Sequence, residues 1–192
     1  MPLPPPSSPR AKKHTRTITV EAYAREDGLW DLDAQITDIK TFDTRLAAAI
    51  RPAGQPVHDL SLRVTIDTRM NIVDAASSSD AVPYAGYCDT ISPAYRKLIG
   101  LNLMKDFRQS VKERLGGTEG CTHVTELALI LPTAAVQAFA GAVFDTRDGS
   151  HDDTSSQKPF QLDRCHALRT DGAAVAKYYP RWSSRASGPE SS

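Results

Sequence analysis

Alternating apolar and polar positions fill the first part of the chain and predict β-strands. A period of two is typical of a strand with one buried face. The turn sequence Glu26-Asp27-Gly28 predicts a hairpin between the first two strands. Short turns between consecutive strands favour an antiparallel meander. The predicted strands span residues 15–24, 30–41 and 60–66, with a fourth beginning at Ile72.

A helical period replaces the alternation in the second part of the chain. Ser92 and Pro93 are typical of a helix start. From Thr122 to near Gly141 the apolar positions again keep a helical spacing, and Pro132 is expected to kink or divide that helix. The fold class is therefore α+β, an antiparallel sheet of four or more strands packed by helices between residues 93 and 141. Apolar residues four apart predict an amphipathic stripe at Leu103, Phe107, Val111 and Leu115.

The two ends differ in composition from the patterned part. Residues 1–13 and 183–192 are rich in proline or serine, so we expect disordered tails around a single α+β domain at residues 14–182. The stretch at residues 42–55 fits either a helical turn or a strand. Further along, a polar loop, a short strand and a short helix are expected at residues 145–158, 160–168 and 171–179.

The charge balance narrows the class of partner. Acidic and basic residues number 23 each, so the composition gives no support for nucleic-acid binding. No stretch approaches the roughly 18 apolar residues of a membrane span. Three cysteines are too few for a disulfide framework and indicate reduced thiols. We expect a cytoplasmic protein that acts without a membrane or nucleic-acid partner; the sequence leaves its oligomeric state open.

A glycine-rich turn at residues 116–120 precedes two candidate metal ligands. It delivers Cys121 and His123, two positions apart, to the start of a predicted helix. Thiolate and imidazole are good ligands for zinc or iron, and free N–H groups at a helix start favour the thiolate. A small core cysteine beside an exposed histidine explains this short motif equally well.

Two other segments supply ligands of the same types. His58 lies at the entrance to the third strand and Cys88 in a loop after the sheet. In a sheet followed by helices, these places and a helix N-terminus can meet at one end of the fold. Four ligands would suit zinc, and three with an open position would make a catalytic site. The predicted metal ligands are His58, Cys88, Cys121 and His123.

Carboxylates and remaining histidines complete the set of candidates. Glu126 and Asp59 are candidate general bases or hydrogen-bond partners of the ligands, although ordinary solvated carboxylates fit both positions. Cys165 and His166 are neighbours in the predicted strand at residues 160–168, so at most one can face a given site. His14 and His151 lie in contexts expected to be flexible and are not expected to bind metal.

Several short motifs resemble one bacterial family throughout the patterned chain. The resemblance is to the domain of unknown function 2889, and it covers residues 14–182. It implies no activity, although a catabolic setting for aromatic or acyl compounds gives a substrate class. The motifs are His14-Thr-Arg16, Asp27-Gly-Leu-Trp-Asp31, Val57-His-Asp59, Tyr95-Arg96 with Leu98, and Gly120-Cys-Thr-His123 with Glu126-Leu127.

A more distant resemblance is to the NifU/IscU-type iron–sulfur scaffold. Pro56-Val-His-Asp59, Gly86-Tyr-Cys88 and Gly120-Cys-Thr-His123 stand in the order of that family's three ligand segments, within residues 54–142. The resemblance implies a NifU/IscU-like core and a cluster or metal carrier. However, His58 stands where the family has a cysteine, and the last pair is Cys-x-His. These departures favour one zinc or iron ion over a cluster.

The predicted function is a metal-dependent enzyme, a hydrolase or lyase, acting on a small molecule. Zinc or iron would act as a Lewis acid or activate water. An iron–sulfur cluster or metal carrier is the alternative from a different class, and a metal-free structural protein is the third.

Overall fold

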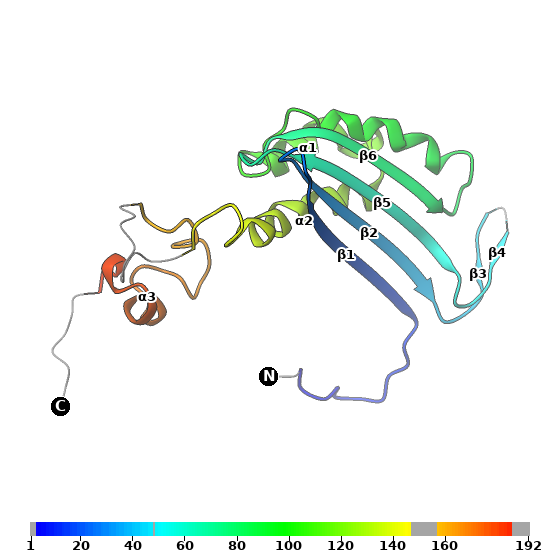
Figure 1. Ribbon diagram of the computed structural model, residues 1–192. Coiled ribbons are helices and arrows are strands. Elements are labelled where there is room, and N and C mark those ends of the chain that lie inside the picture. Colours follow the sequence, from blue (N-terminus) through cyan, green and yellow to red (C-terminus); the bar gives the residue numbers. More distant parts are fainter. Residues whose placement is uncertain (1–2, 48, 147–156, 186–192) are drawn as a thin grey trace. The chain divides into compact units, whose positions relative to one another are not determined.

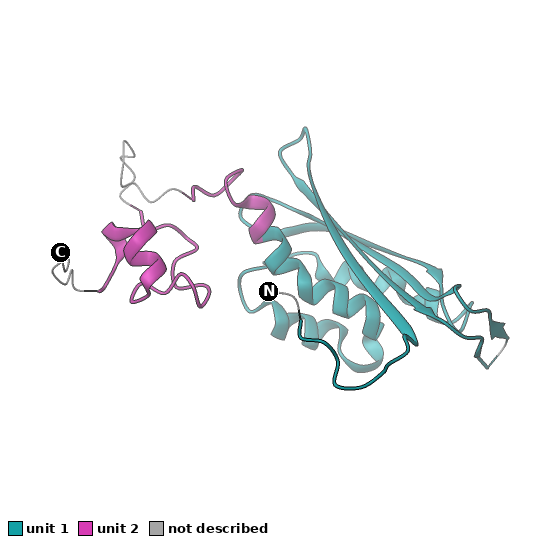
Figure 2. Cartoon of the chain, turned by 90° about the horizontal axis from the view of Figure 1, so that it is seen from below, with its two compact units in different colours: residues 1–135 teal, residues 136–192 magenta. Residues whose placement is uncertain are grey.

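The computed structural model describes residues 3–47, 49–146 and 157–185. The chain divides into two compact units, Met1–Ala135 and Val136–Ser192, coloured teal and magenta in Figure 2. The single domain expected at residues 14–182 stays a prediction. Residues 3–13 are exposed and lie outside helices and strands.

The first unit contains an antiparallel sheet of four strands in the spatial order β1-β2-β5-β6 (Figure 1). The predicted meander and the α+β class are confirmed. Between β2 and β5 the undecided stretch forms a small two-stranded ladder of β3 (Thr44–Arg45) and β4 (Ile50–Arg51). The four strands of the sheet are β1 (His14–Ala24), β2 (Trp30–Lys40), β5 (Pro56–Ile66) and β6 (Ile72–Ala81).

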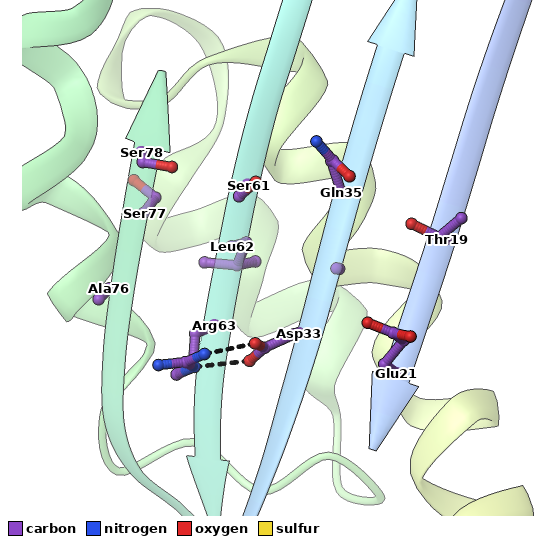
Figure 3. Close-up of a pocket in the computed structure, with 11 residues that line it drawn as sticks. Thr19, Glu21, Asp33, Gln35, Ser61, Leu62, Arg63, Ala76, Ser77 and Ser78 are labelled. Atoms are coloured by element: carbon purple, nitrogen blue, oxygen red, sulfur yellow. Dashed lines mark hydrogen bonds and ion pairs between the residues drawn. The ribbon is translucent and has the colours of Figure 1, made fainter. Parts of the chain in front are cut away.

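The two faces of this sheet differ in polarity. Helices cover one face (Figure 2), and the apolar positions of β2 and β5 that point toward it are buried. The other face is polar and carries a cavity of about 440 Å³ above the strands (Figure 3). Asp33 and Arg63 form an ion pair there. The buried side chains are Leu32, Ala34, Ile36, Leu60, Leu62, Val64 and Ile66.

The helices that follow the sheet differ in part from the prediction. Ser92 and Pro93 lie inside a 3-10 helix, η1 (Cys88–Leu98), and do not begin an α-helix. Pro93 stands in the middle of η1, where its nitrogen has no N–H to donate to a backbone carbonyl. The stripe of the next helix is confirmed in α1 (Phe107–Leu115), where Phe107, Val111 and Leu115 are buried, and Leu103 is buried just before it.

Helix α2, which begins in the first unit, is less interrupted than expected. It follows the short 3-10 helix η2 (Gly117–Glu119) and runs over Thr122–Phe139 without a division at Pro132. Its apolar residues Leu127, Leu131 and Ala135 are fully buried. Packing of that face stabilises the helix although Pro132 removes one hydrogen bond.

The second unit contains the expected helix as α3 (Ala173–Tyr178), followed by the 3-10 helix η3 (Pro180–Trp182). The prediction of a short strand at residues 160–168 was wrong, since these residues form turns. Asp163 has a positive φ of 60° and its N–H donates to the carbonyl of Leu168, which closes a turn instead of extending a strand. Residues 147–156 of the expected polar loop and residues 186–192 of the expected tail lie outside the described residues.

Among the described residues, no helix combines the length and apolar character that crossing a membrane requires.

A buried tyrosine fixes the start of α2. Tyr95 is fully buried, and its hydroxyl donates to the carbonyl of Cys121 at 2.8 Å and accepts from the N–H of Cys121 at 2.9 Å. Thr125 Oγ1 lies 2.9 Å from the same hydroxyl. Burial raises the pKa of Tyr95, which keeps the phenol protonated. One side chain of η1 thus holds the backbone at the N-terminus of α2.

Replacing Tyr95 by phenylalanine should therefore destabilise the protein by about 1–3 kcal/mol, because the N–H of Cys121 and the hydroxyl of Thr125 lose a partner. Urea denaturation measures the change. Tyr87→Phe is the matched control, since Tyr87 is 81% exposed, and it should cost less than about 0.5 kcal/mol. Equal midpoints for the two variants would contradict this role of Tyr95.

Candidate metal centre

Near one end of the sheet, ionisable side chains take the place of apolar ones on the face that the helices cover. Asp38 follows Ile36 by two positions and so points to the same side, under the helices. Arg16 of β1 and His58 of β5 are its direct partners across the sheet. Three neighbouring strands therefore place Arg16, Asp38 and His58 in one row. His14 lies two residues before Arg16 on the same side of β1.

Asp38 is the centre of this row and is only 3% exposed. Arg16 donates to both carboxylate oxygens, from Nε at 2.9 Å and from Nη2 at 2.8 Å. Nε2 of His14 lies 2.7 Å from Oδ1, and Nδ1 of His58 lies 3.0 Å from Oδ2. Burial opposes ionisation, but the hydrogen bonds from Arg16 and His14 hold the pKa of Asp38 well below its usual range. The group is a carboxylate at neutral pH.

Helix α2 adds a third imidazole beside Asp38, that of His123. Nε2 of His123 lies 3.8 Å from Oδ2 of Asp38, and its ring stacks against His58 with a centroid distance of 3.9 Å. Burial lowers the pKa of His123, and the neighbouring His58 and Arg16 lower it further. His123 is therefore held in the neutral form, which is the form that binds a metal ion.

Asp38, His58 and His123 could hold a metal ion together. One potential ligand atom from each lies within 4.8 Å of the others. Ligand bonds of about 2.0–2.1 Å in a tetrahedral site place the ligand atoms about 3.3 Å apart. The distances of 3.0 and 3.8 Å from Oδ2 of Asp38 to the two imidazoles bracket that value. A metal ion would replace the proton that Nδ1 of His58 shares with Asp38.

Two of the predicted ligands belong to this group, namely His58 and His123. Cys121 is half-buried beside it, with Sγ 3.9 Å from Nδ1 of His123, but it is not one of the three grouped residues. Cys88 begins η1 after β6 and does not belong to the group, whose strand residues come from β2 and β5.

The two predicted carboxylates have different surroundings. Asp59 is the neighbour of His58 in β5 and points to the opposite face of the sheet, where Gln35 donates to it at 2.7 Å. It does not reach the cluster. Glu126 lies one helical turn after His123 and accepts a hydrogen bond from Nη1 of Arg16 at 2.8 Å. Its side chain is 42% exposed, so Arg16 links the buried Asp38 to a carboxylate at the surface.

Cys165 and His166 lie in an exposed turn of the second unit. His14 was expected in a flexible context, and the structure corrects this, because it is the first residue of β1 and contacts Asp38.

Sequence reasoning missed Asp38 and Arg16 as members of the site. The sequence alternation could have indicated them, because both residues occupy positions on the apolar side of their strands. Asp38 lies two positions after Ile36, and Arg16 lies two positions before Ile18. An ionisable residue on the buried parity must find a partner on a neighbouring strand, since an unpaired buried charge is costly.

The glycine-rich turn has a structural role at this site. A Cβ atom on Gly120 would lie 2.6 Å from the carbonyl oxygen of Leu115, which is closer than real Cβ contacts. Only glycine allows the chain to fold back so closely after α1. This close approach, together with Tyr95, brings the start of α2 and hence His123 over the sheet.

The fold and the cluster define an α+β protein with a candidate metal centre of two imidazoles and a carboxylate. Residues 14–137, more than half of the chain, match the family described as "Protein of unknown function (DUF2889)". The chain belongs to this family. No curated protein and no solved structure matches it, so the expected NifU/IscU-like core has no support from a comparison. All cluster residues, from His14 to Glu126, lie within the matched part.

Asp38→Asn should destabilise the metal-free protein by about 1.5–3 kcal/mol, because Arg16, His14 and His58 lose the ionised carboxylate to which they hydrogen-bond. Chemical denaturation in the presence of a chelator measures this. Asp59→Asn makes the same chemical change one residue from His58 but on the other face, and should cost less than about 1 kcal/mol. A loss of the same size in both variants would contradict the central position of Asp38.

Proposed function

We propose that this domain is a metal-dependent enzyme acting on a small molecule, with one zinc or iron ion held by Asp38, His58 and His123. One observation carries the proposal. Two imidazoles and a buried, ionised carboxylate from three separate elements meet within 4.8 Å. Two histidines with a carboxylate are a ligand set that catalytic zinc and non-haem iron sites both use.

Three protein ligands leave a coordination position for water or substrate, which is the arrangement of a catalytic rather than a structural site. The imidazoles are reachable from solvent, since the side chains of His58 and His123 are 18% and 25% exposed. A bound metal ion would supply Lewis acidity or lower the pKa of a bound water.

The surrounding side chains support this role. Arg16 fixes the orientation of Asp38 through its two hydrogen bonds, so the carboxylate is already placed before a metal ion arrives. Arg16 also holds Glu126 at the solvent side of the cluster. Glu126 is therefore the candidate general base of the proposed enzyme. A hydrolase or lyase acting on a small acyl or aromatic compound is the expected reaction class.

The second candidate function is a non-enzymatic carrier of a metal ion or an iron–sulfur cluster. A cluster is normally held by cysteine thiolates. In the part of the chain that the structure describes, Cys121 brings a thiol beside the group, and the group itself offers nitrogen and oxygen atoms. This donor chemistry favours a single metal ion over a cluster.

Metal analysis of the purified protein tests the proposal directly. We expect about one zinc or iron ion per chain. His123→Ala removes a metal ligand and should lower the affinity for the metal ion by at least about tenfold. Loss of a residue that only hydrogen-bonds to a ligand already has an effect of that size. His123 makes no short hydrogen bond to Asp38, so this variant is expected to keep its fold, which circular dichroism verifies.

His166→Ala is the matched control, since it removes an imidazole from an exposed turn of the second unit. Its metal content should equal that of the unaltered protein. A brown protein with visible charge-transfer bands would favour the cluster carrier. A folded protein that retains no metal after purification and after incubation with zinc or ferrous iron would refute the site.

A further inference from the structure

Strand β1 forms an outer edge of the sheet. It is 11 residues long and, in the part of the chain that the structure describes, pairs with β2 alone (Figure 1). An edge strand presents backbone N–H and C=O groups that are available to a further strand. The other outer strand, β6, packs against η1.

Two backbone hydrogen bonds show which groups of β1 point outward. At one end the N–H of Thr41 donates to the carbonyl of Lys13, and at the other the N–H of Arg25 donates to the carbonyl of Leu29. Hydrogen-bonded pairs alternate along an antiparallel ladder. The odd-numbered residues of β1 therefore bond to β2, and the even-numbered residues from His14 to Ala24 direct their N–H and C=O groups away from the sheet.

Bulges, proline and lysine, which often protect an edge, are absent from the middle of β1. Its pairing with β2 has no bulge over the whole length, whereas the β2–β5 and β5–β6 pairings both contain register shifts. The stretch at residues 17–24 has no proline and no lysine. Ile18 and Val20 are only half-buried, although they point to the covered face. Such an edge, regular in its pairing and partly apolar, is suited to strand pairing.

We propose that β1 pairs with β1 of a second copy of this chain, antiparallel and centred on Thr19. This register lets the full strand pair with itself, because His14 then stands opposite Ala24 of the second copy. The outward backbone groups of Ile18 and Val20 would bond across the axis. The two four-stranded sheets would join into one continuous sheet through a symmetric interface, which is the commonest kind in homodimers.

The side chains favour the chain itself as the partner. In this register Ile18 faces Val20, Thr19 faces Thr19, and Thr17 faces Glu21. The charged Arg16 and Glu21 each face an uncharged residue, so no like charges oppose one another, and such oppositions would destabilise a strand pair. The half-exposed Ile18 and Val20 would be covered by their symmetry mates.

This interface would also border the candidate metal centre. Arg16 and His14 lie on the same side of β1 as Ile18 and have partly exposed side chains. In the paired sheet they would face Ala22 and Ala24 of the second copy, whose small side chains narrow the access to Asp38 without closing it. The pairing itself does not depend on a bound metal ion.

Light scattering coupled to size exclusion, from low to high micromolar protein, tests the pairing. We expect a dimer. Ala22→Pro should shift the protein toward monomer by at least about tenfold in dissociation constant, because proline removes an outward N–H and fits an edge strand without loss of a bond to β2. Ala22→Val keeps that N–H and is the matched control, which should remain dimeric. Circular dichroism verifies that both variants fold.

A disulfide test fixes the register. In a Cys165→Ser background, Thr19→Cys should form an intermolecular disulfide on mild oxidation, because directly opposed residues at a non-hydrogen-bonded position have Cα atoms about 4.5 Å apart, within disulfide range. Thr17→Cys is the control and should not crosslink, since it faces Glu21. A protein that is monomeric at every concentration would refute the proposal. A dimer would also refute it if the Ala22→Pro variant stays dimeric and the Thr19→Cys variant forms no intermolecular disulfide.

Discussion

The ionised carboxylate of Asp38, buried beneath the helices, is the interaction on which the structure of the site depends. A charge at 3% exposure is costly unless donors surround it, and Arg16, His14 and His58 supply them. These donors come from β1 and β5, so the charge requires β2 to have both neighbours in the observed register. A shift of one residue in either pairing would turn the donors to the other face of the sheet.

The same requirement explains the position of α2. Arg16 spans from Asp38 to Glu126, and His123 stacks on His58, so the first turns of the helix contact two strands of the sheet through polar groups. Tyr95 holds the backbone at that point, and Gly120 allows the chain to approach α1 closely enough. The polar cluster and the helix start therefore position each other, which is the preorganisation that a metal site needs.

Strand β1 contributes to this arrangement both through its covered face and through its outer edge. Its covered face brings His14 and Arg16 to Asp38, while its outer edge directs backbone groups away from the sheet. The open face of the sheet, by contrast, is polar and carries the Asp33–Arg63 pair. The candidate chemistry thus lies on one face of the sheet, and the proposed contact with a second copy lies along the edge that borders it.

The sequence by itself determined the elements of the sheet and the helical stripe of α1, because strand alternation and helical period are local properties of the chain. It also located His58 and His123, since both are ligand types at the start of predicted elements.

The sequence could not determine which elements meet. Cys88 was grouped with those histidines because the segments that carry them were expected to meet at one end of the fold, and Asp59 was named as a candidate base. Cys88 is not one of the three grouped residues, and Asp59 points to the opposite face of the sheet. Asp38 joined only through the β1–β2–β5 register, a property of pairing between distant segments. The tertiary structure decided the composition of the site because a buried charge is stabilised by partners that the fold, and not the local sequence, brings to it.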